Sequence, residues 1–107
     1  MAFSKQSHYS QESQMISGFF KALGFPGRIE IVIKLQIEGP LTVRQLAKGH
    51  PICMETISQH LKILRKAQLV IADERYPYTI YRVHKANMKR AKKALDRFFS
   101  HFVGDMS

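Results

Sequence analysis

Residues 41–67 read LTVRQLAKGHPICMETISQHLKILRKA, and this stretch decides the fold. Thr42 is followed three residues later by Gln45, the spacing of a capping box in which each side chain bonds to the other residue's backbone N–H. This spacing predicts a short helix over 43–48. A glycine and a proline then end that helix, and a second helix is expected over 54–67. Two helices joined by a tight turn form a helix-turn-helix pattern.

The second of these helices has two unlike faces. Ile57, Leu61 and Leu64 recur at helical spacing and form an apolar face that can dock on the rest of the domain. The opposite face is polar without being uniformly charged, and it consists of Glu55, Ser58, Gln59, Lys62 and Lys66. A recognition helix needs one face for its own core and another for base edges in a major groove. The pattern therefore favours contact with DNA through the outer face.

Downstream, the pattern changes from helical to alternating. Strands are expected over 69–73 and 79–83, joined by a short turn with proline at 74–78, so the pair predicts a hairpin. A last helix is expected over 85–102. Its apolar stripe, at helical spacing, consists of Met88, Ala91, Leu95, Phe98 and Phe102. A hairpin directly after a helix-turn-helix is expected to form a wing.

Upstream, residues 1–10 are expected to be a loose polar lead-in, and a single domain is expected over 11–107. A helix is expected from about Gln11 to Gly24. Its apolar stripe consists of Met15, Ile16, Phe19, Phe20 and Leu23. Pro26 suits the first turn of a second helix, which is expected to be buried on most sides. On that helix the residues expected to face one way are Ile29, Val32, Ile33 and Ile37, and Ile31 and Leu35 are expected to broaden this stripe.

These elements define the expected fold class. It is mainly α with a small β-hairpin (α+β): a winged helix-turn-helix of four helices, two strands and a last helix. The chain has 107 residues, with 17 Lys and Arg against 8 Asp and Glu, so its formal net charge is +9. That excess suggests nucleic acid, an anionic membrane surface or an acidic protein as partner.

Composition also limits where the protein is expected to work. No apolar run is longer than Leu69–Ala72, far short of the roughly 18 residues of a transmembrane helix. The polar start of the chain does not look like a secretory signal. The single cysteine excludes an internal disulfide and suits a reducing cytoplasm. A cytoplasmic protein without membrane contact is therefore expected.

Candidate DNA contacts come from the short helix, the polar face of the longer helix and the hairpin. Gln59 carries an amide suited to adenine, and Glu55 can accept from a cytosine amino group. Lys62 and Lys66 can meet phosphates. The full set of candidates is Thr42, Arg44, Met54, Glu55, Thr56, Ser58, Gln59, Lys62, Lys66, Arg75, Tyr76 and Tyr78.

Several of these stretches resemble the ArsR-type (arsenic-repressor) family of winged-helix transcriptional regulators. The most specific piece is residues 58–65, Ser-Gln-His-Leu-Lys-Ile-Leu-Arg, and residues 41–47, 69–70 and 81–83 also match. The resemblance covers about residues 19–99. It implies a homodimer that binds double-stranded operator DNA and represses transcription. In the family the first and last helices form the dimer interface, which here implicates Met15, Phe19, Leu23, Leu95, Phe98 and Phe102.

The chain departs from the family pattern at the metal-binding positions. Metal-sensing members carry Cys-Val-Cys where this chain has Thr42-Val43-Arg44, and the last helix lacks the aspartate–histidine pairs of other members. We therefore expect no metal site, no cofactor and no metal sensing, and the pattern specifies no inducer. Phe25 replaces the aspartate before the helix-opening proline. Gln68 replaces a glycine, so it is expected either to adopt a left-handed conformation or to reshape that corner.

Cys53 leaves two interpretations open. It lies where a helix N-cap belongs, and a thiol at a helix start can have a lowered pKa and act as a redox switch. Alternatively, it is a small capping residue in a position where serine is the stronger choice.

The function also has an alternative from another class. A winged helix can dock an acidic protein instead of DNA, and such a module would show apolar anchors on the outer face of the helix over 54–67. Ser58, Gln59 and Lys62 on that face are polar, which favours DNA. No nucleophile has a recognisable base and orienting group, so an enzyme is not expected.

Overall fold

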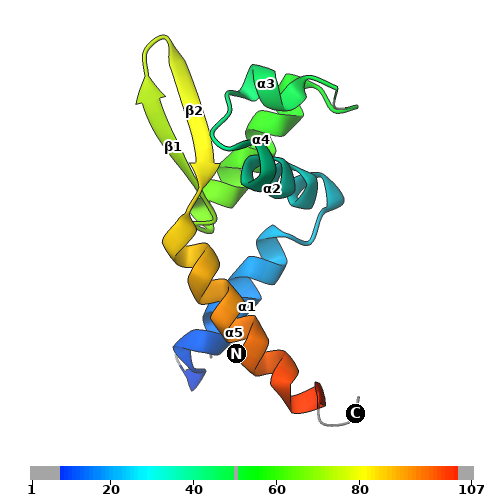
Figure 1. Ribbon diagram of the computed structural model, residues 1–107, viewed down its shortest axis with the longest axis vertical. Helices are drawn as coiled ribbons and strands as arrows, with labels where there is room; N and C mark the ends of the chain where they lie inside the picture. The colour runs from blue at the N-terminus through cyan, green and yellow to red at the C-terminus, as the bar shows by residue number, and fades with distance from the viewer. Residues whose placement is uncertain (1–7, 50, 104–107) are drawn as a thin grey trace.

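The computed structural model describes residues 8–49 and 51–103. The elements in chain order are α1 (Gln11–Ala22), α2 (Pro26–Glu38), α3 (Val43–Ala47), α4 (Met54–Lys66), β1 (Val70–Arg75), β2 (Tyr78–Val83) and α5 (Lys85–Val103) (Figure 1). This order confirms the winged helix-turn-helix, mainly α with one antiparallel hairpin. Of the predicted lead-in, residues 1–7 lie outside the described residues. No helix in the described part of the chain is long and apolar enough to cross a bilayer.

Local sequence explains where the helices begin. The Ser10 side chain accepts a hydrogen bond from the backbone N–H of Ser13, which caps α1. Pro26 stands at the start of α2, where a missing N–H does no harm. The capping box of α3 is confirmed: Gln45 N–H donates to Thr42 Oγ1 at 3.1 Å, and Thr42 N–H donates to Gln45 Oε1 at 2.8 Å.

The core forms around α4, which packs against α2, α3 and β1. Its apolar face is buried as the periodicity predicts. The largest fully buried side chains of the chain are Ile31, Leu35, Leu46, Ile57, Leu61, Leu64 and Leu69. Because these side chains come from α2, α3, α4 and the residue directly before β1, burying them fixes the helix-turn-helix relative to the hairpin.

The predicted orientation of α2 is wrong. The helix turns Ile31, Val32 and Leu35 into the core. The residues expected to share a buried face with Val32, namely Ile29, Ile33 and Ile37, are 43%, 45% and 78% exposed. The physical reason is that α2 packs on α4 and β2 along one side only, so its second apolar stripe stays at the surface.

The wing is longer than the sequence suggests. β1 and β2 pair antiparallel from Val70 opposite Val83 to Arg75 opposite Tyr78, which leaves only Tyr76 and Pro77 in the turn. The five-residue turn expected over 74–78 is therefore wrong, since most of its residues extend the strands.

A backbone pair joins the wing to the start of α3. Leu41 N–H donates to the Tyr81 carbonyl at 2.9 Å, and Tyr81 N–H donates to the Leu41 carbonyl at 2.8 Å. Leu41 directly precedes Thr42, the N-cap of α3. The hairpin is thereby fixed against the helix-turn-helix by two hydrogen bonds that no periodicity reveals.

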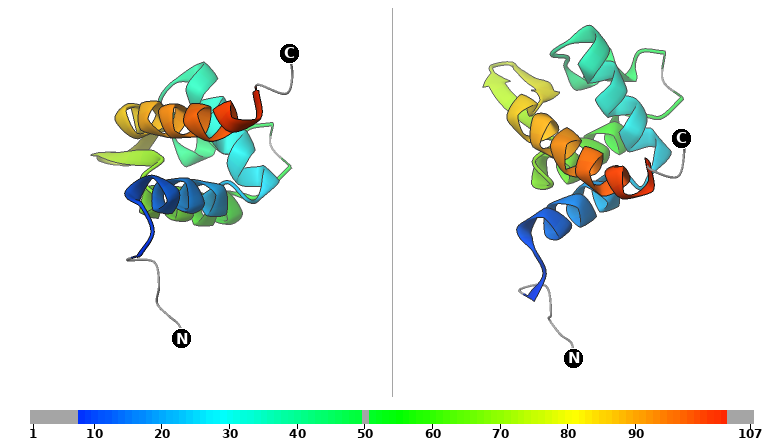
Figure 2. Two further views of the ribbon diagram at one scale, coloured as in Figure 1. Left: turned by 90° about the horizontal axis from the view of Figure 1, so that it is seen from below. Right: turned by 60° about the horizontal axis from the view of Figure 1, so that its bottom comes forward.

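Helices α1 and α5 lie side by side at the end of the molecule away from α3 and the wing tip (Figures 1 and 2). The Arg97 guanidinium donates to the Glu12 carboxylate, with Nε 3.0 Å from Oε1, and ties the two helices together. The Cα radius of gyration is 16.0 Å, whereas about 13 Å is typical of a compact chain of this length. The α1–α5 pair therefore projects from the core as an arm.

The corner between α4 and β1 adopts the first of the two predicted forms. Gln68 has a φ of 62°, the left-handed region where glycine is more common. The Asn87 amide Nδ2 donates to the Gln68 carbonyl at 2.9 Å. Asn87 is 7% exposed, so this bond is made in the interior and holds the corner against the first turns of α5.

Candidate nucleic-acid interface

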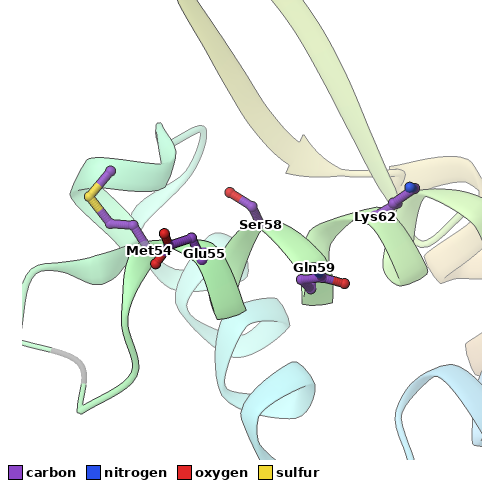
Figure 3. Close-up of a pocket in the computed structure, with 5 residues that line it drawn as sticks. All are labelled: Met54, Glu55, Ser58, Gln59 and Lys62. Carbon is purple, nitrogen blue, oxygen red and sulfur yellow. The ribbon is translucent and has the colours of Figure 1, made fainter.

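The outer face of α4 carries most of the predicted base-reading side chains together. Met54, Glu55, Ser58, Gln59 and Lys62 line one open hollow of about 700 Å³. Figure 3 shows them spaced along one side of the helix, with Met54 at one end and Lys62 at the other. On the reverse side of α4 the buried residues are Ile57, His60, Leu61 and Leu64. The helix thus presents a polar face while an apolar face anchors it.

Charge changes along this face. The acidic residue, Glu55, lies in the first turn of α4, and Arg65 and Lys66 lie in the last turn. This distribution matches the helix dipole, which favours a carboxylate at the N-terminus and cations at the C-terminus. It also places an acceptor at the start of the helix and cations about two to three turns later.

A second hollow lies between α3 and the wing. Thr42 and Arg44 from the first helix of the motif line it together with Tyr78 from β2, and its volume is about 300 Å³. The Leu41–Tyr81 backbone pair described above fixes these two elements at this point. Three further candidates therefore meet at one place, although 34 residues separate Arg44 from Tyr78 in the chain.

The wing tip is open to solvent. Tyr76 is 99% exposed and Tyr78 is 63% exposed. Arg82 in β2 is paired with Asp73, with 2.8 Å between Nε and Oδ2, whereas Arg75 at the tip takes part in none of the ion pairs found among the described residues. The positive charge of Arg75 is therefore not balanced by an ion-pair partner among the described residues.

Two candidates lie apart from these groups. Thr56 is half-buried and its hydroxyl Oγ1 lies 3.4 Å from Cys53 Sγ, so the side chain is engaged within its own helix start. Lys66 lines a different hollow, where the end of α4 meets α1 and α5. That hollow also contains Arg90, which sequence reasoning did not select.

Cys53 is exposed and is the N-cap residue of α4. Hydrogen bonding from the Thr56 side chain, and then from its backbone N–H, lowers the pKa of the thiol from its usual value, because both stabilise the thiolate. The structure thus adds Thr56 as a hydrogen-bond partner of the exposed cysteine.

The two positions at which metal-sensing members of the family carry cysteines hold Thr42 and Arg44 in this chain. Thr42 and Arg44 lie at the start of α3, where one supplies the helix cap and the other faces the hollow beside the wing. Across residues 8–49 and 51–103, no group of three or more His, Cys, Asp or Glu side chains is placed to hold a metal ion.

The α1–α5 arm exposes aromatic side chains. Phe98, Phe99 and Phe102 are 46%, 49% and 58% exposed, and the rings of Phe98 and Phe99 lie 5.0 Å apart edge to face. Phe20 on α1 is 49% exposed. A largely apolar hollow of about 570 Å³ lies next to them; its lining residues include Phe20, Leu23, Leu95 and Phe99.

One residue of the predicted dimer interface is placed differently. Phe19 is only 5% exposed and belongs to the protomer core, so it has little surface left for a partner. Sequence reasoning missed Phe20 and Phe99 as interface candidates. Both belong to apolar pairs, Phe19-Phe20 and Phe98-Phe99, and the pattern alone does not say which member of a pair turns outward.

A capped short helix, a second helix with a polar outer face and an adjoining β-hairpin together define a winged helix-turn-helix protein of the DNA-binding kind. The family model "Bacterial regulatory protein, arsR family" matches residues 26–72 of the chain. The HTH-type transcriptional regulator Rv2034 of Mycobacterium tuberculosis (strain ATCC 25618 / H37Rv) is 30% identical over 74 residues, which are 69% of each chain.

Solved structures share the same fold. An ArsR-like transcriptional regulator from Rhodococcus sp. RHA1 aligns with a TM-score of 0.76 at 22% identity, over 91% of each chain. The homodimeric winged helix-turn-helix DNA-binding domain of Mb0332 from Mycobacterium bovis, a possible ArsR-family regulator, aligns with a TM-score of 0.65 at 19% identity, over 94% of this chain and 91% of that one. The chain belongs to the ArsR family, whose members are transcriptional regulators rather than enzymes.

Proposed function

We propose that this regulator is a homodimeric repressor that reads operator DNA with the outer face of α4 and does not sense metals. The observation that carries the proposal is that Met54, Glu55, Ser58, Gln59 and Lys62 line one open hollow along the outer face of α4. A face of this kind matches the mixed donors and acceptors of a major groove.

The exposed residues in the first turns of α4 are the ones that we propose contact the bases. Gln59 can bond to the N6 and N7 edge of adenine with its amide, and Glu55 can accept from the N4 amino group of cytosine. Ser58 can act as donor or acceptor. Met54 offers an apolar contact to a thymine methyl group, and Thr56 supports the helix start beside Cys53.

Phosphate contacts surround the base-reading face. Lys62 and Lys66 follow toward the C-terminal end of α4, and Thr42 and Arg44 lie beside the wing. Arg75, with the exposed rings of Tyr76 and Tyr78, is suited to a neighbouring groove. Cations of this kind add affinity that does not depend on sequence and weakens with salt.

Dimerisation through the α1–α5 arm is supported by its exposed apolar surface. The proposed interface consists of Met15, Leu23, Leu95, Phe98 and Phe102, with Phe20 and Phe99 added and Phe19 left out because it is buried. A two-fold interface would cover the aromatic cluster of both copies at once. The Mb0332 domain, which shares the fold, is homodimeric, and this supports dimerisation of the present chain.

We further propose that residues 11–107 act as one DNA-binding and dimerisation domain in the cytoplasm. The core cluster supports a single domain, because it runs from Phe19 and Ala22 in α1 to Ala91 in α5. Absence of metal sensing is supported by Thr42 and Arg44, whose hydroxyl and guanidinium groups are poor ligands where thiolates would be needed.

The alternative, docking of an acidic protein, is not favoured. A surface that docks a protein through the outer face of α4 would need apolar anchors there. Instead, Ser58, Gln59 and Lys62 on that face are polar and exposed.

The test first selects an operator from random duplex DNA and then compares two variants by fluorescence anisotropy on operator and scrambled duplexes at several salt concentrations. Gln59→Ala should relax preference at one position of each half-site, a loss of about 1–3 kcal/mol in discrimination, with little change in salt dependence. Arg75→Ala should weaken binding to both duplexes alike and lower the salt slope by about one.

The two variants act as controls for each other, because one removes a proposed base contact and the other a proposed phosphate contact. Identical behaviour of both variants, or no effect of either, would show that α4 does not enter the major groove. Failure of the wild-type protein to select any duplex would reject the DNA-reading function itself.

A further inference from the structure

The end of α4 opens into a hollow between α1 and α5 that the proposed DNA contacts do not explain. Its volume is about 390 Å³, and its polar lining comes from Gln11 and Gln14 on α1, Lys66 and Gln68 at the end of α4, and Asn87 and Arg90 on α5. Lys66 and Arg90 are exposed, so their charges face solvent across this corner.

The Arg90 side chain is held in place by the buried side chain of Asn87. Its Nη1 donates to Asn87 Oδ1 at 3.2 Å, and the same Asn87 amide donates through Nδ2 to the Gln68 carbonyl at 2.9 Å. Asn87 is 7% exposed and cannot swing freely. The guanidinium is therefore partly ordered before any ligand arrives, which lowers the entropy that binding must remove.

The partner of Arg90 is neutral, unlike the partners of Lys92 and Arg97 on the same helix. Lys92 Nζ lies 2.8 Å from the Asp96 carboxylate, and Arg97 is paired with Glu12. Arg90 takes part in none of the ion pairs formed among the described residues. It thus combines a fixed position with an uncompensated positive charge.

The corner is continuous with the face that we assign to DNA. Gln59, Lys62 and Lys66 follow one another at spacings of three and four residues, so they share one side of α4. That side leads from the base-reading hollow toward the corner, where Lys66 and Arg90 line the same hollow. Guanidinium and ammonium groups that converge on an open surface are suited to a phosphate.

We infer that this corner binds a backbone phosphate of the operator, with Arg90 and Lys66 as its cationic ligands and Asn87 as the residue that positions Arg90. The inference deepens the proposed DNA-reading function and rests on it. It extends the contact surface from α4 onto α5, a helix otherwise assigned to the dimer.

The test compares Arg90→Gln with Lys93→Gln, which removes the same charge from an exposed position of α5 that does not line the corner. Binding to operator and scrambled duplexes is measured by anisotropy over a fourfold range of salt. Loss of one phosphate contact lowers the salt slope by about 0.9, so the fourfold rise in salt should cost wild type about 3.5-fold more affinity than Arg90→Gln. Lys93→Gln should keep the wild-type slope.

Two more variants separate contact from folding. Arg90→Lys keeps the charge and should retain the slope. Asn87→Ala should weaken both duplexes with α-helical circular dichroism unchanged, because it releases Arg90 without removing its charge. If Arg90→Gln keeps the wild-type slope, the inference is overturned, whereas base discrimination by Gln59 would still stand or fall on its own variant.

A free anion is the competing occupant. Inorganic phosphate is titrated at constant ionic strength while the amide resonance of Asn87 is followed. Saturation of that signal, combined with an unchanged salt slope in Arg90→Gln, would assign the corner to a small anion and reject the DNA contact.

Discussion

His60 Nδ1 lies 3.4 Å from Nη1 of Arg28, and this contact joins the inner face of α4 to α2. A guanidinium only donates hydrogen bonds, so Nδ1 is the acceptor in this contact. Arg28 Nε also donates to the Ala22 carbonyl at the end of α1. One arginine therefore links the arm, α2 and the recognition helix.

Removing this link should destabilise the fold. Arg28→Ala removes the donor that faces His60 Nδ1 and the Ala22 carbonyl, so the free energy of unfolding should fall by about 1–3 kcal/mol. Urea denaturation of Arg28→Ala, His60→Ala and the double variant gives the coupling, expected at about 0.5–1.5 kcal/mol. Strictly additive single effects would mean that the two side chains act independently.

The approach of α2 to α4 predicts a glycine requirement. A Cβ at Gly27 would lie 3.0 Å from His60 Nε2 and 3.2 Å from Ile52 Cδ1. Gly27→Ala should therefore cost about 1–3 kcal/mol of stability and weaken operator binding, because α4 must shift. Gly18→Ala is the control: its Cβ meets nothing within 4 Å, and alanine should stabilise α1 by about 0.5–1 kcal/mol. Equal melting temperatures for the two variants would contradict this packing.

Phe98→Asp should dissociate the dimer. Burying a phenylalanine contributes about 1.5–3 kcal/mol, and a two-fold interface loses it twice, so the dimer dissociation constant should rise by about 100-fold or more. Sedimentation equilibrium at micromolar concentration measures this, and operator affinity should fall with it. Ser100→Asp adds the same charge on another side of α5 and should remain dimeric. A wild-type protein that is monomeric under these conditions would exclude the α1–α5 interface.

The hydrogen bond between Thr56 and Cys53 should control thiol reactivity. Since this bond lowers the pKa of Cys53, the thiolate fraction at a given pH is raised, and Thr56→Val should move the pH midpoint of iodoacetamide alkylation upward. Under the redox interpretation, peroxide weakens operator binding by wild type but not by Cys53→Ser. If wild type tolerates peroxide, Cys53 serves only as a cap.

Metals should leave DNA binding unchanged. Thr42 and Arg44 hold no thiolate, so zinc, cadmium and arsenite at stoichiometric levels are expected to have no effect on an operator gel shift. Release by any of these, if a histidine or cysteine substitution abolished it, would require a metal site of another composition.

Sequence predicted best where polar and apolar residues separate cleanly around a helix. Ile57, Leu61 and Leu64 recur on one side of α4, so both its buried and its exposed face could be inferred, and the capping box fixed the start of α3. In α2, Ile31 and Ile33 are equally apolar, yet one is fully buried and the other 45% exposed. Periodicity does not choose between two apolar faces, because the choice depends on which side α4 and β2 occupy.

Contacts between residues far apart in the chain could not be predicted either, because they too depend on where neighbouring elements lie. Arg90 resembles the other cations of α5 in sequence, and its setting becomes distinct only because Asn87 bonds to Gln68 across 19 residues. A left-handed Gln68 was one of the two expected conformations, because Gln68 stands where the family has glycine. The Asn87 amide that bonds to its carbonyl could not be predicted.

The backbone pair between Leu41 and Tyr81 has a mechanical consequence for operator geometry. Because the hairpin is bonded to the residue before α3, a force on the wing tip is passed to the helix-turn-helix, and the two rotate together. Adjustment to half-sites at different separations must then occur in the joints to the arm, at residues 23–25 before α2 and at His84 before α5. In the proposed dimer, short joints of this kind would resist bending, so we expect the arm to limit the half-site spacings that the protein accepts.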